Sequence, residues 1–124
     1  MKKSEILRGR DLFKRVALKG KRVDTGLFRC TYVARRADQV GLQVGFKVPS
    51  KKLNAVRRNR IRRLMREGFS ARRSELDQAL ETAKAEVQMM IVFKAVQVMP
   101  IEKLRLSMLL DDLDAICHTI ANRL

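Results

Sequence analysis

The hydrophobic positions follow a helical period near the start of the chain. In residues 10–19, Phe13 and Val16 fall on one side of a predicted helix, and Gly20 is a typical helix stop. Phe13 is by residue type a core side chain, and this is its simplest interpretation. Residues 21–24 then have the length of a short edge strand.

The period changes to two residues in the next two segments, which predicts strands at 27–35 and 40–48. The core-facing positions are Phe28, Cys30, Tyr32 and Ala34 in the first strand and Val40, Leu42, Val44, Phe46 and Val48 in the second. The other face of the second strand carries Gly41, Gln43, Gly45 and Lys47 and is almost bare. Glycines inside a strand mark either a close approach of another chain or a bulge, and the sequence leaves both open. Residues 36–39 are predicted to join the two strands as a hairpin.

An arginine-rich helix is predicted next, over residues 55–70, with Asn54 as its N-cap. At 100° per residue its apolar side holds Ile61, Leu64, Met65 and Phe69, and a second side holds Asn59, Arg62, Arg63 and Arg66. The helical pattern continues through residues 74–84. A cationic stripe this dense repels itself, which favours a polyanionic partner such as nucleic acid.

The last part of the chain reads as a buried strand at 87–98 and a final helix that starts near Pro100. The apolar stripe of that helix is Ile101, Leu104, Met108, Leu109, Ile116 and Ile120. The order is therefore helix, two or three strands, helix, strand, helix. This predicts a single α+β domain over residues 1–124, an α/β sandwich in which helices pack on one sheet.

Charge separates two parts of the chain. The net charge is +15, and residues 1–73 hold 23 Lys/Arg against 5 Asp/Glu, whereas residues 74–124 hold 5 against 8. With 46% hydrophobic residues the chain can fold around a core, so it is not a disordered basic tail. No long apolar segment or apolar signal region is present, which predicts a cytoplasmic protein without a membrane anchor.

No arrangement of residues predicts a catalytic centre or a metal site. His118 is the only histidine, and no acid is spaced along the sequence to orient it. Asp111, Asp112 and Asp114 fan around a helix and do not converge on a metal ion. Two distant cysteines, Cys30 and Cys117, are expected to be reduced and buried.

Residues 54–67 resemble the protein subunit of bacterial ribonuclease P. The signature of that family is an Arg-Asn-Arg helix, here Arg58-Asn59-Arg60 followed by Arg62, Arg63 and Arg66. The flanks are similar too, in Val44-Gly45, Lys51 and Asn54-Ala55-Val56, and in the spacing of Leu7, Phe13, Val16 and Gly20. The resemblance covers nearly the whole chain.

The resemblance implies an αβββαβα fold in which a left-handed βαβ crossover, an exception to the usual right-handed rule, carries the arginine helix. It also implies a function as the protein subunit of ribonuclease P. A catalytic RNA would use Mg²⁺ to remove the 5′ leader of precursor tRNA, and one protein would bind each RNA. No cofactor is expected on the protein alone.

The resemblance also implies site residues. Those expected to contact the catalytic RNA and precursor tRNA are Lys51, Arg58, Asn59, Arg60, Arg62, Arg63 and Arg66. Those expected to form the leader cleft are Phe13, Arg29, Thr31, Gln43, Gly45, Lys47 and Lys94. In Phe13 an aromatic ring can stack on a base. Ala17 and Thr31 stand where the family often has further aromatic residues, so charge and backbone are expected to contribute more here.

Two other classes of function fit the composition. A ribosomal or assembly protein that packages RNA fits the charge equally well, and the Arg58-Asn59-Arg60 motif favours ribonuclease P over it. A DNA-binding helix fits less well, because adjacent arginines suit phosphates better than base edges and no helix-turn-helix pair is visible.

Overall fold

The structure is a computed structural model that describes residues 5, 10–49, 53–94 and 103–124, with the backbone alone at 10–13. Eight elements follow one another in these ranges. They are α1 (Arg10–Lys19), β1 (Lys21–Asp24), β2 (Phe28–Arg36), β3 (Gly41–Lys47), α2 (Ala55–Arg72), α3 (Ser74–Ala83), β4 (Ala85–Phe93) and α4 (Leu106–Arg123). The predicted α+β class is confirmed.

The four strands form one sheet in the order β1-β2-β4-β3. The predicted hairpin between β2 and β3 is wrong, because β4 lies between them, antiparallel to β2 and parallel to β3. The reason is burial: every second residue of β4, from Ala85 to Phe93, is buried, so this apolar strand takes a central place in the sheet. A parallel pair needs a crossover connection, and α2 and α3 provide it between β3 and β4. The handedness of that crossover stays a prediction.

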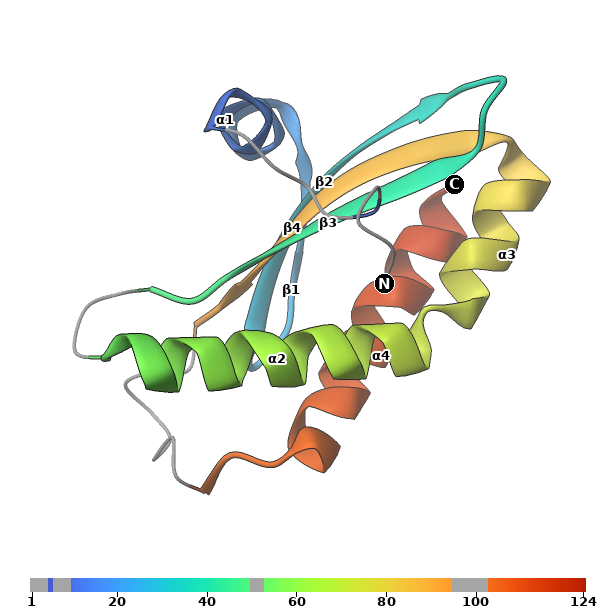
Figure 1. The fold of residues 1–124 in the computed structure, drawn as a ribbon. Helices are drawn as coiled ribbons and strands as arrows, with labels where there is room; N and C mark the ends of the chain where they lie inside the picture. The colour runs from blue at the N-terminus through green and yellow to red at the C-terminus, as the bar shows by residue number, and fades with distance from the viewer. Residues whose placement is uncertain (1–4, 6–9, 50–52, 95–102) are drawn as a thin grey trace.

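One face of the sheet carries the core. Its buried side chains include the predicted Phe28, Cys30, Tyr32, Leu42 and Val44, together with Val87, Met89, Ile91 and Phe93 of β4. Helices α2, α3 and α4 cover this face, and α1 lies on the opposite side of the sheet (Figure 1). The predicted sandwich of one sheet and packed helices is therefore confirmed.

The helix boundaries differ from the predictions in two places. The arginine helix ends at Arg72 and a separate α3 begins at Ser74, two residues further on. The last helix begins at Leu106, later than predicted; Pro100 and Ile101 lie outside the described residues. Met108 was assigned to its buried stripe, but 45% of it is exposed because it lies on the solvent side of α4.

Candidate nucleic-acid interface

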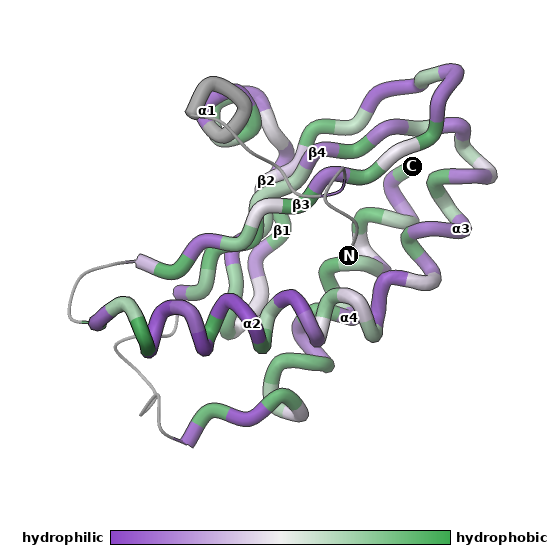
Figure 2. Tube along the Cα trace, in the orientation of Figure 1, coloured by the Kyte–Doolittle hydropathy of each residue, from purple (hydrophilic) through white to green (hydrophobic). Residues whose placement is uncertain are grey.

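The arginine-rich helix α2 is held at its start by a cap and along one side by the core. The Asn54 side chain accepts a hydrogen bond from the Arg57 backbone N–H at 2.9 Å, as predicted for an N-cap. The buried residues of the helix are Ile61, Met65, Gly68 and Phe69. A Cβ atom on Gly68 would lie 2.6 Å from a methyl group of Leu113 in α4, so glycine permits this close packing of α2 on α4. Polar residues recur along the whole length of α2 in Figure 2 and lie outside this buried set.

We call Arg58, Asn59, Arg62, Arg63 and Arg66 the arginine row. No side chain of the row forms a hydrogen bond or ion pair with any residue that the structure describes. Asn59, Arg63 and Arg66 are exposed; Arg58 and Arg62 are half-buried, and their Nε atoms are covered without a hydrogen-bond partner among the described residues. A covered donor without a partner is uncommon in a folded protein and favours binding of an external acceptor. The acidic residues of the C-terminal part that the structure describes do not pair with the row.

Arg60 differs from the other predicted RNA-contacting arginines. Its Nη2 atom donates a hydrogen bond to the backbone carbonyl of Leu104 at 2.8 Å, ahead of α4. This contact links α2 to the segment that leads into α4. At least part of the Arg60 guanidinium group thus serves the fold.

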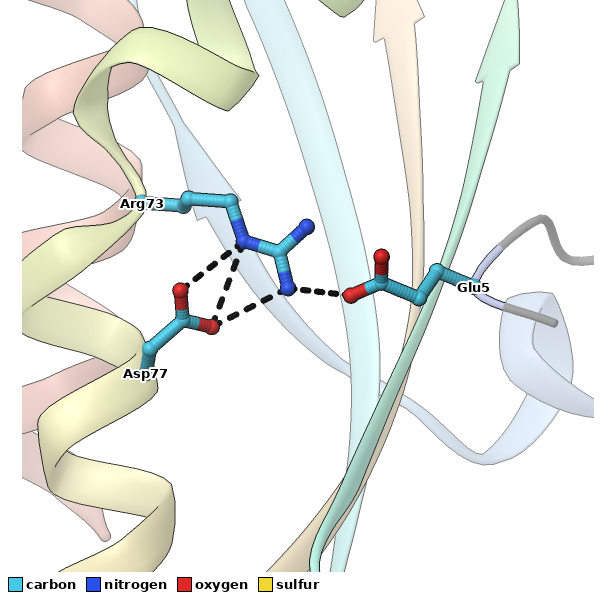
Figure 3. Close-up of polar contacts among 3 residues, drawn as sticks. All are labelled: Glu5, Arg73 and Asp77. Atoms are coloured by element: carbon cyan, nitrogen blue, oxygen red, sulfur yellow. Dashed lines mark hydrogen bonds and ion pairs between the residues drawn. The ribbon is translucent and has the colours of Figure 1, made fainter. Parts of the chain in front are cut away.

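Arg73, between α2 and α3, forms several contacts within the protein. Its guanidinium group binds Asp77 of α3 at 2.9 Å and also binds the Glu5 carboxylate, as Figure 3 shows. It also lies 5.9 Å from the centre of the Phe69 ring. Burial acts to lower the pKa of Arg73, but the hydrogen bonds and charges of Asp77 and Glu5 outweigh burial and raise the pKa. Arg73 therefore stabilises the junction of α2 and α3.

The sheet face opposite the core, here called the open face, holds the predicted floor of the leader cleft. These residues are Arg29, Thr31, Gln43, Gly45 and Lys47. The strand register places them in rows across the sheet: Thr31, Met90 and Gly45 are neighbours, as are Arg29, Val92 and Lys47. Lys94 follows directly after β4, where its backbone N–H donates to Leu27 at 2.9 Å. The structure thus brings the predicted residues from three strands together.

Helix α1 packs on the open face and bounds it. Val16 is fully buried there, and Gly20 ends the helix against β2. A Cβ atom on Gly20 would lie 2.4 Å from the Val16 carbonyl oxygen and 2.5 Å from Cγ2 of Thr31, so only glycine fits. Phe13 belongs to α1, but its side chain lies outside the described part of the chain, as does Lys51.

The open face also carries polar residues that the sequence analysis did not assign to the site. Asp24 of β1 lies 3.2 Å from Arg29 and 3.9 Å from Lys94, and so moderates the charge at that end. In the row next to Gly45, Gln88 of β4 donates to Gln43 at 2.9 Å. One row further, Glu86 pairs with Arg35 at 3.1 Å. The alternating pattern of β4 could have placed Gln88 on the open face, but it could not have identified Gln43 as the neighbour of Gln88.

The described residues contain no nucleophile–base arrangement. The prediction that no acid orients His118 is wrong, because Nδ1 of His118 lies 2.7 Å from Glu75 of α3. This pair is exposed and has no nucleophile beside it. Cys117, next in sequence, is a buried free thiol, and burial raises its pKa to about 12; burial raises the pKa of Cys30 as well. A thiol with such a pKa is almost entirely protonated near pH 7 and is a poor nucleophile.

The described residues contain no group of three or more His, Cys, Asp or Glu side chains that could hold a metal ion. No helix in the described ranges has the length and apolar character that a membrane span requires.

Comparison with known proteins gives matches by sequence. Residues 1–120 match the family model described as Ribonuclease P. The ribonuclease P protein component of Chlorobaculum tepidum is 35% identical over 98 residues, a match that covers 73% of this chain. The same match covers 64% of that relative, which is less than two thirds of its length.

Solved structures give matches by fold. The ribonuclease P protein from Thermotoga maritima superposes with a TM-score of 0.73 and 19% identity, over 93% of this chain and 96% of that one. The ribonuclease P protein of Staphylococcus aureus gives a TM-score of 0.69 and 19% identity, over 95% and 96% of the two chains. At this identity the two structures show a shared fold.

Proposed function

The chain belongs to the ribonuclease P protein family, and from this premise we propose that it is the protein subunit of ribonuclease P. In this role it binds the catalytic RNA and the 5′ leader of precursor tRNA. It thereby assists the Mg²⁺-dependent endonucleolytic cut that gives the mature 5′ end of tRNA. One protein acts with one RNA in the cytoplasm, and the reacting groups belong to the RNA.

The observation that carries this proposal is that the arginine row pairs with none of the residues that the structure describes. Four guanidinium groups and the Asn59 amide have no partner among the described residues, although the chain carries 13 acidic residues. Cations held this close together repel one another, and phosphate groups relieve that repulsion. Guanidinium groups also bind phosphate oxygens with two parallel hydrogen bonds. The row is therefore suited to the backbones of the catalytic RNA and of the substrate near the cleavage site.

The open face supports the second part of the proposal, a cleft for the leader. Arg29, Lys47 and Lys94 offer positive charge at one end. The adjoining row of Thr31, Met90 and Gly45 is uncharged. A single strand fits such a surface, with phosphates near the cations and bases on the uncharged row. Phe13 of α1 would add a ring for stacking.

The chemistry of the cut is assigned to Mg²⁺ bound through the RNA. The described residues supply no carboxylate cluster that fits a metal ion and no activated nucleophile. The protein would act by reducing phosphate repulsion between two RNAs and by positioning the leader.

Cleavage assays with and without RNA test this proposal. Precursor tRNA is incubated with the protein, with a bacterial ribonuclease P RNA, and with both, at a moderate Mg²⁺ concentration. We expect the protein alone to leave the substrate intact, and the two together to cleave faster than the RNA alone. Cleavage by RNA-free protein, or sedimentation of the protein with ribosomal subunits, would contradict the proposal.

A further inference from the structure

One end of the open face differs in character from the rest of this cationic surface. There Glu86, Gln88 and Gln43 lie on neighbouring positions of β4 and β3, and all three are half-buried. We call these three side chains the amide–carboxylate platform. A carboxylate repels phosphate, so this part of a nucleic-acid cleft does not suit the RNA backbone.

The platform retains hydrogen-bonding capacity after its internal contacts are made. Gln88 donates to Gln43 at 2.9 Å, and whichever way the two amides are turned, one NH₂ group and one carbonyl oxygen stay free. Arg35 binds Oε2 of Glu86 at 3.1 Å, which leaves Oε1 without a partner among the described residues. The platform therefore presents a charged acceptor beside a donor–acceptor amide pair.

Space for a ligand exists on both sides of Glu86. A hollow of about 470 Å³ at the β3 edge is lined by residues that include Gly41, Gln43 and Glu86. This volume lies in the range of sites that hold a small planar molecule. A small hollow of about 50 Å³ on the other side is lined by Arg15 of α1, Arg35, Glu86 and Gln88. Arg15 and Arg35 are exposed at its rim, where they can hold the phosphates on either side of a base.

We propose that the amide–carboxylate platform reads the edge of one RNA base and selects bases that carry an exocyclic amino group. Adenine, cytosine and guanine each donate from that amino group to the Glu86 carboxylate while a ring or carbonyl atom meets the Gln43–Gln88 pair. Uracil has no amino group, and its one N–H lies between two carbonyl oxygens that a carboxylate repels. The platform thus disfavours uracil. This inference rests on the proposed function, in which the open face holds the leader.

The test uses the assembled protein–RNA enzyme and precursor tRNAs that differ at one leader nucleotide at a time. Each leader position carries in turn adenosine, purine riboside, which lacks the 6-amino group, or uridine, and the Kd is measured without cleavage. We expect one position where adenosine binds about tenfold more tightly than the other two, the effect of a hydrogen bond to a charged group.

Variants connect the preference to the platform. Glu86→Gln keeps the shape and removes the charge, so the preference for adenosine should fall several-fold, and Gln88→Met should also weaken it. Glu81→Gln is the matched control, because Glu81 is exposed on α3 and undergoes the same change of charge. Thermal unfolding of each variant confirms that the fold is intact.

The outcomes separate this inference from the proposed function. If the three nucleotides bind equally at every leader position while the leader still adds affinity, base reading by the platform is wrong and the proposed function stands. The same conclusion follows if Glu86→Gln retains the full preference. If precursor and mature tRNA bind equally well with or without the protein, the leader is not bound by it, and both proposals fail.

Discussion

At the scale of single residues, the arginines of α2 and its junction with α3 differ in what neutralises them. Arg62 and Arg66 have no partner among the described residues, Arg60 binds the Leu104 carbonyl, and Arg73 binds two carboxylates. An exposed cation is solvated at little cost, whereas a covered one needs an acceptor. The unpartnered arginines are therefore the ones to examine for phosphate contacts.

The double substitution Arg62→Ala and Arg66→Ala tests those contacts. Loss of two phosphate contacts should make the negative slope of log Kobs against log salt shallower by about two units, or by about 1.4 units if the RNA is single-stranded. Binding to the catalytic RNA is measured at salt concentrations from about 50 to about 300 mM, over which phosphate contacts strongly affect Kobs. Arg36→Ala with Arg72→Ala is the control of equal charge, at exposed arginines outside the row. Equal slopes for both pairs would mean that the row does not face phosphate.

Gly20→Ala tests the packing of α1 on the open face. The new methyl group would lie 2.4 Å from a backbone oxygen, so α1 must shift, at a cost of about 1–3 kcal/mol in the free energy of unfolding. Gly26→Ala is the control, because the nearest atom to its Cβ is 3.8 Å away. Urea unfolding measures both variants. Equal stability would show that α1 is not fixed by this contact.

The buried thiol of Cys117 predicts a loss of stability at alkaline pH. An unfolded cysteine ionises near pH 8.5, whereas burial raises the pKa of Cys117 to about 12 in the folded chain. Its contribution to stability is complete below pH 8.5 and is lost as the pH rises toward 12, by about 1.4 kcal/mol per pH unit. Urea unfolding at pH 8 and 10 should therefore show a steeper decline for the wild type than for Cys117→Ala. Parallel declines would mean that the thiol ionises readily in the fold.

Sequence predicts much at this scale and misses the rest for a physical reason. The period of two in β2 and β3 correctly places Thr31 and Gln43 on the open face. The sequence pattern cannot show that Arg60 binds Leu104 or that Glu75 contacts His118, because these partners are 44 and 43 positions apart in sequence. Such contacts depend on how the helices pack.

At the scale of elements, the junction of α2 and α3 depends on Arg73. Arg73→Ala removes hydrogen bonds to two carboxylates and a contact with Phe69, and should cost about 1–3 kcal/mol in unfolding free energy. Arg72→Ala, an exposed neighbour in sequence, should change it by less than about 0.5 kcal/mol. Chemical denaturation measures both. If Arg73→Ala weakened RNA binding more than stability, Arg73 would belong with the phosphate contacts instead.

The position of β4 in the sheet could not be predicted from the sequence. The elements themselves follow from local periods, and each predicted helix and strand has a counterpart in the structure. The partner of each strand does not follow from these periods. The connection at residues 36–39 is compatible with direct pairing of β2 and β3 as well as with the observed arrangement, in which β4 lies between them. Burial decides the outcome, since β4 is the most apolar strand and gains most from two neighbours. The open face thus includes β4 residues, such as Gln88 and Met90, that were not among the predicted cleft residues.

At the scale of the whole molecule, positive charge is concentrated in the part of the chain that forms α1, the first three strands and α2. Acidic residues gather on α3 and α4, at Glu75, Asp77, Glu81, Asp111, Asp112 and Asp114. A protein polarised in this way approaches RNA with one side. In the proposed function, the bound protein would replace part of the counterion layer and lower the charge repulsion between catalytic RNA and substrate.

This neutralisation predicts how the Mg²⁺ requirement of cleavage changes. The RNA alone must recruit cations to bring two polyanions together, whereas the RNA with the protein needs fewer, so half-maximal cleavage should occur at a lower Mg²⁺ concentration. Arg62→Ala with Arg66→Ala should move that concentration part of the way back toward the value for RNA alone, and Arg36→Ala with Arg72→Ala should move it less. Raising the monovalent salt should narrow the gap between RNA and complex, because the protein's charges are then screened. A requirement for Mg²⁺ that is the same with and without the protein, at low salt, would show that the protein acts by holding the leader alone and not by neutralising the RNA.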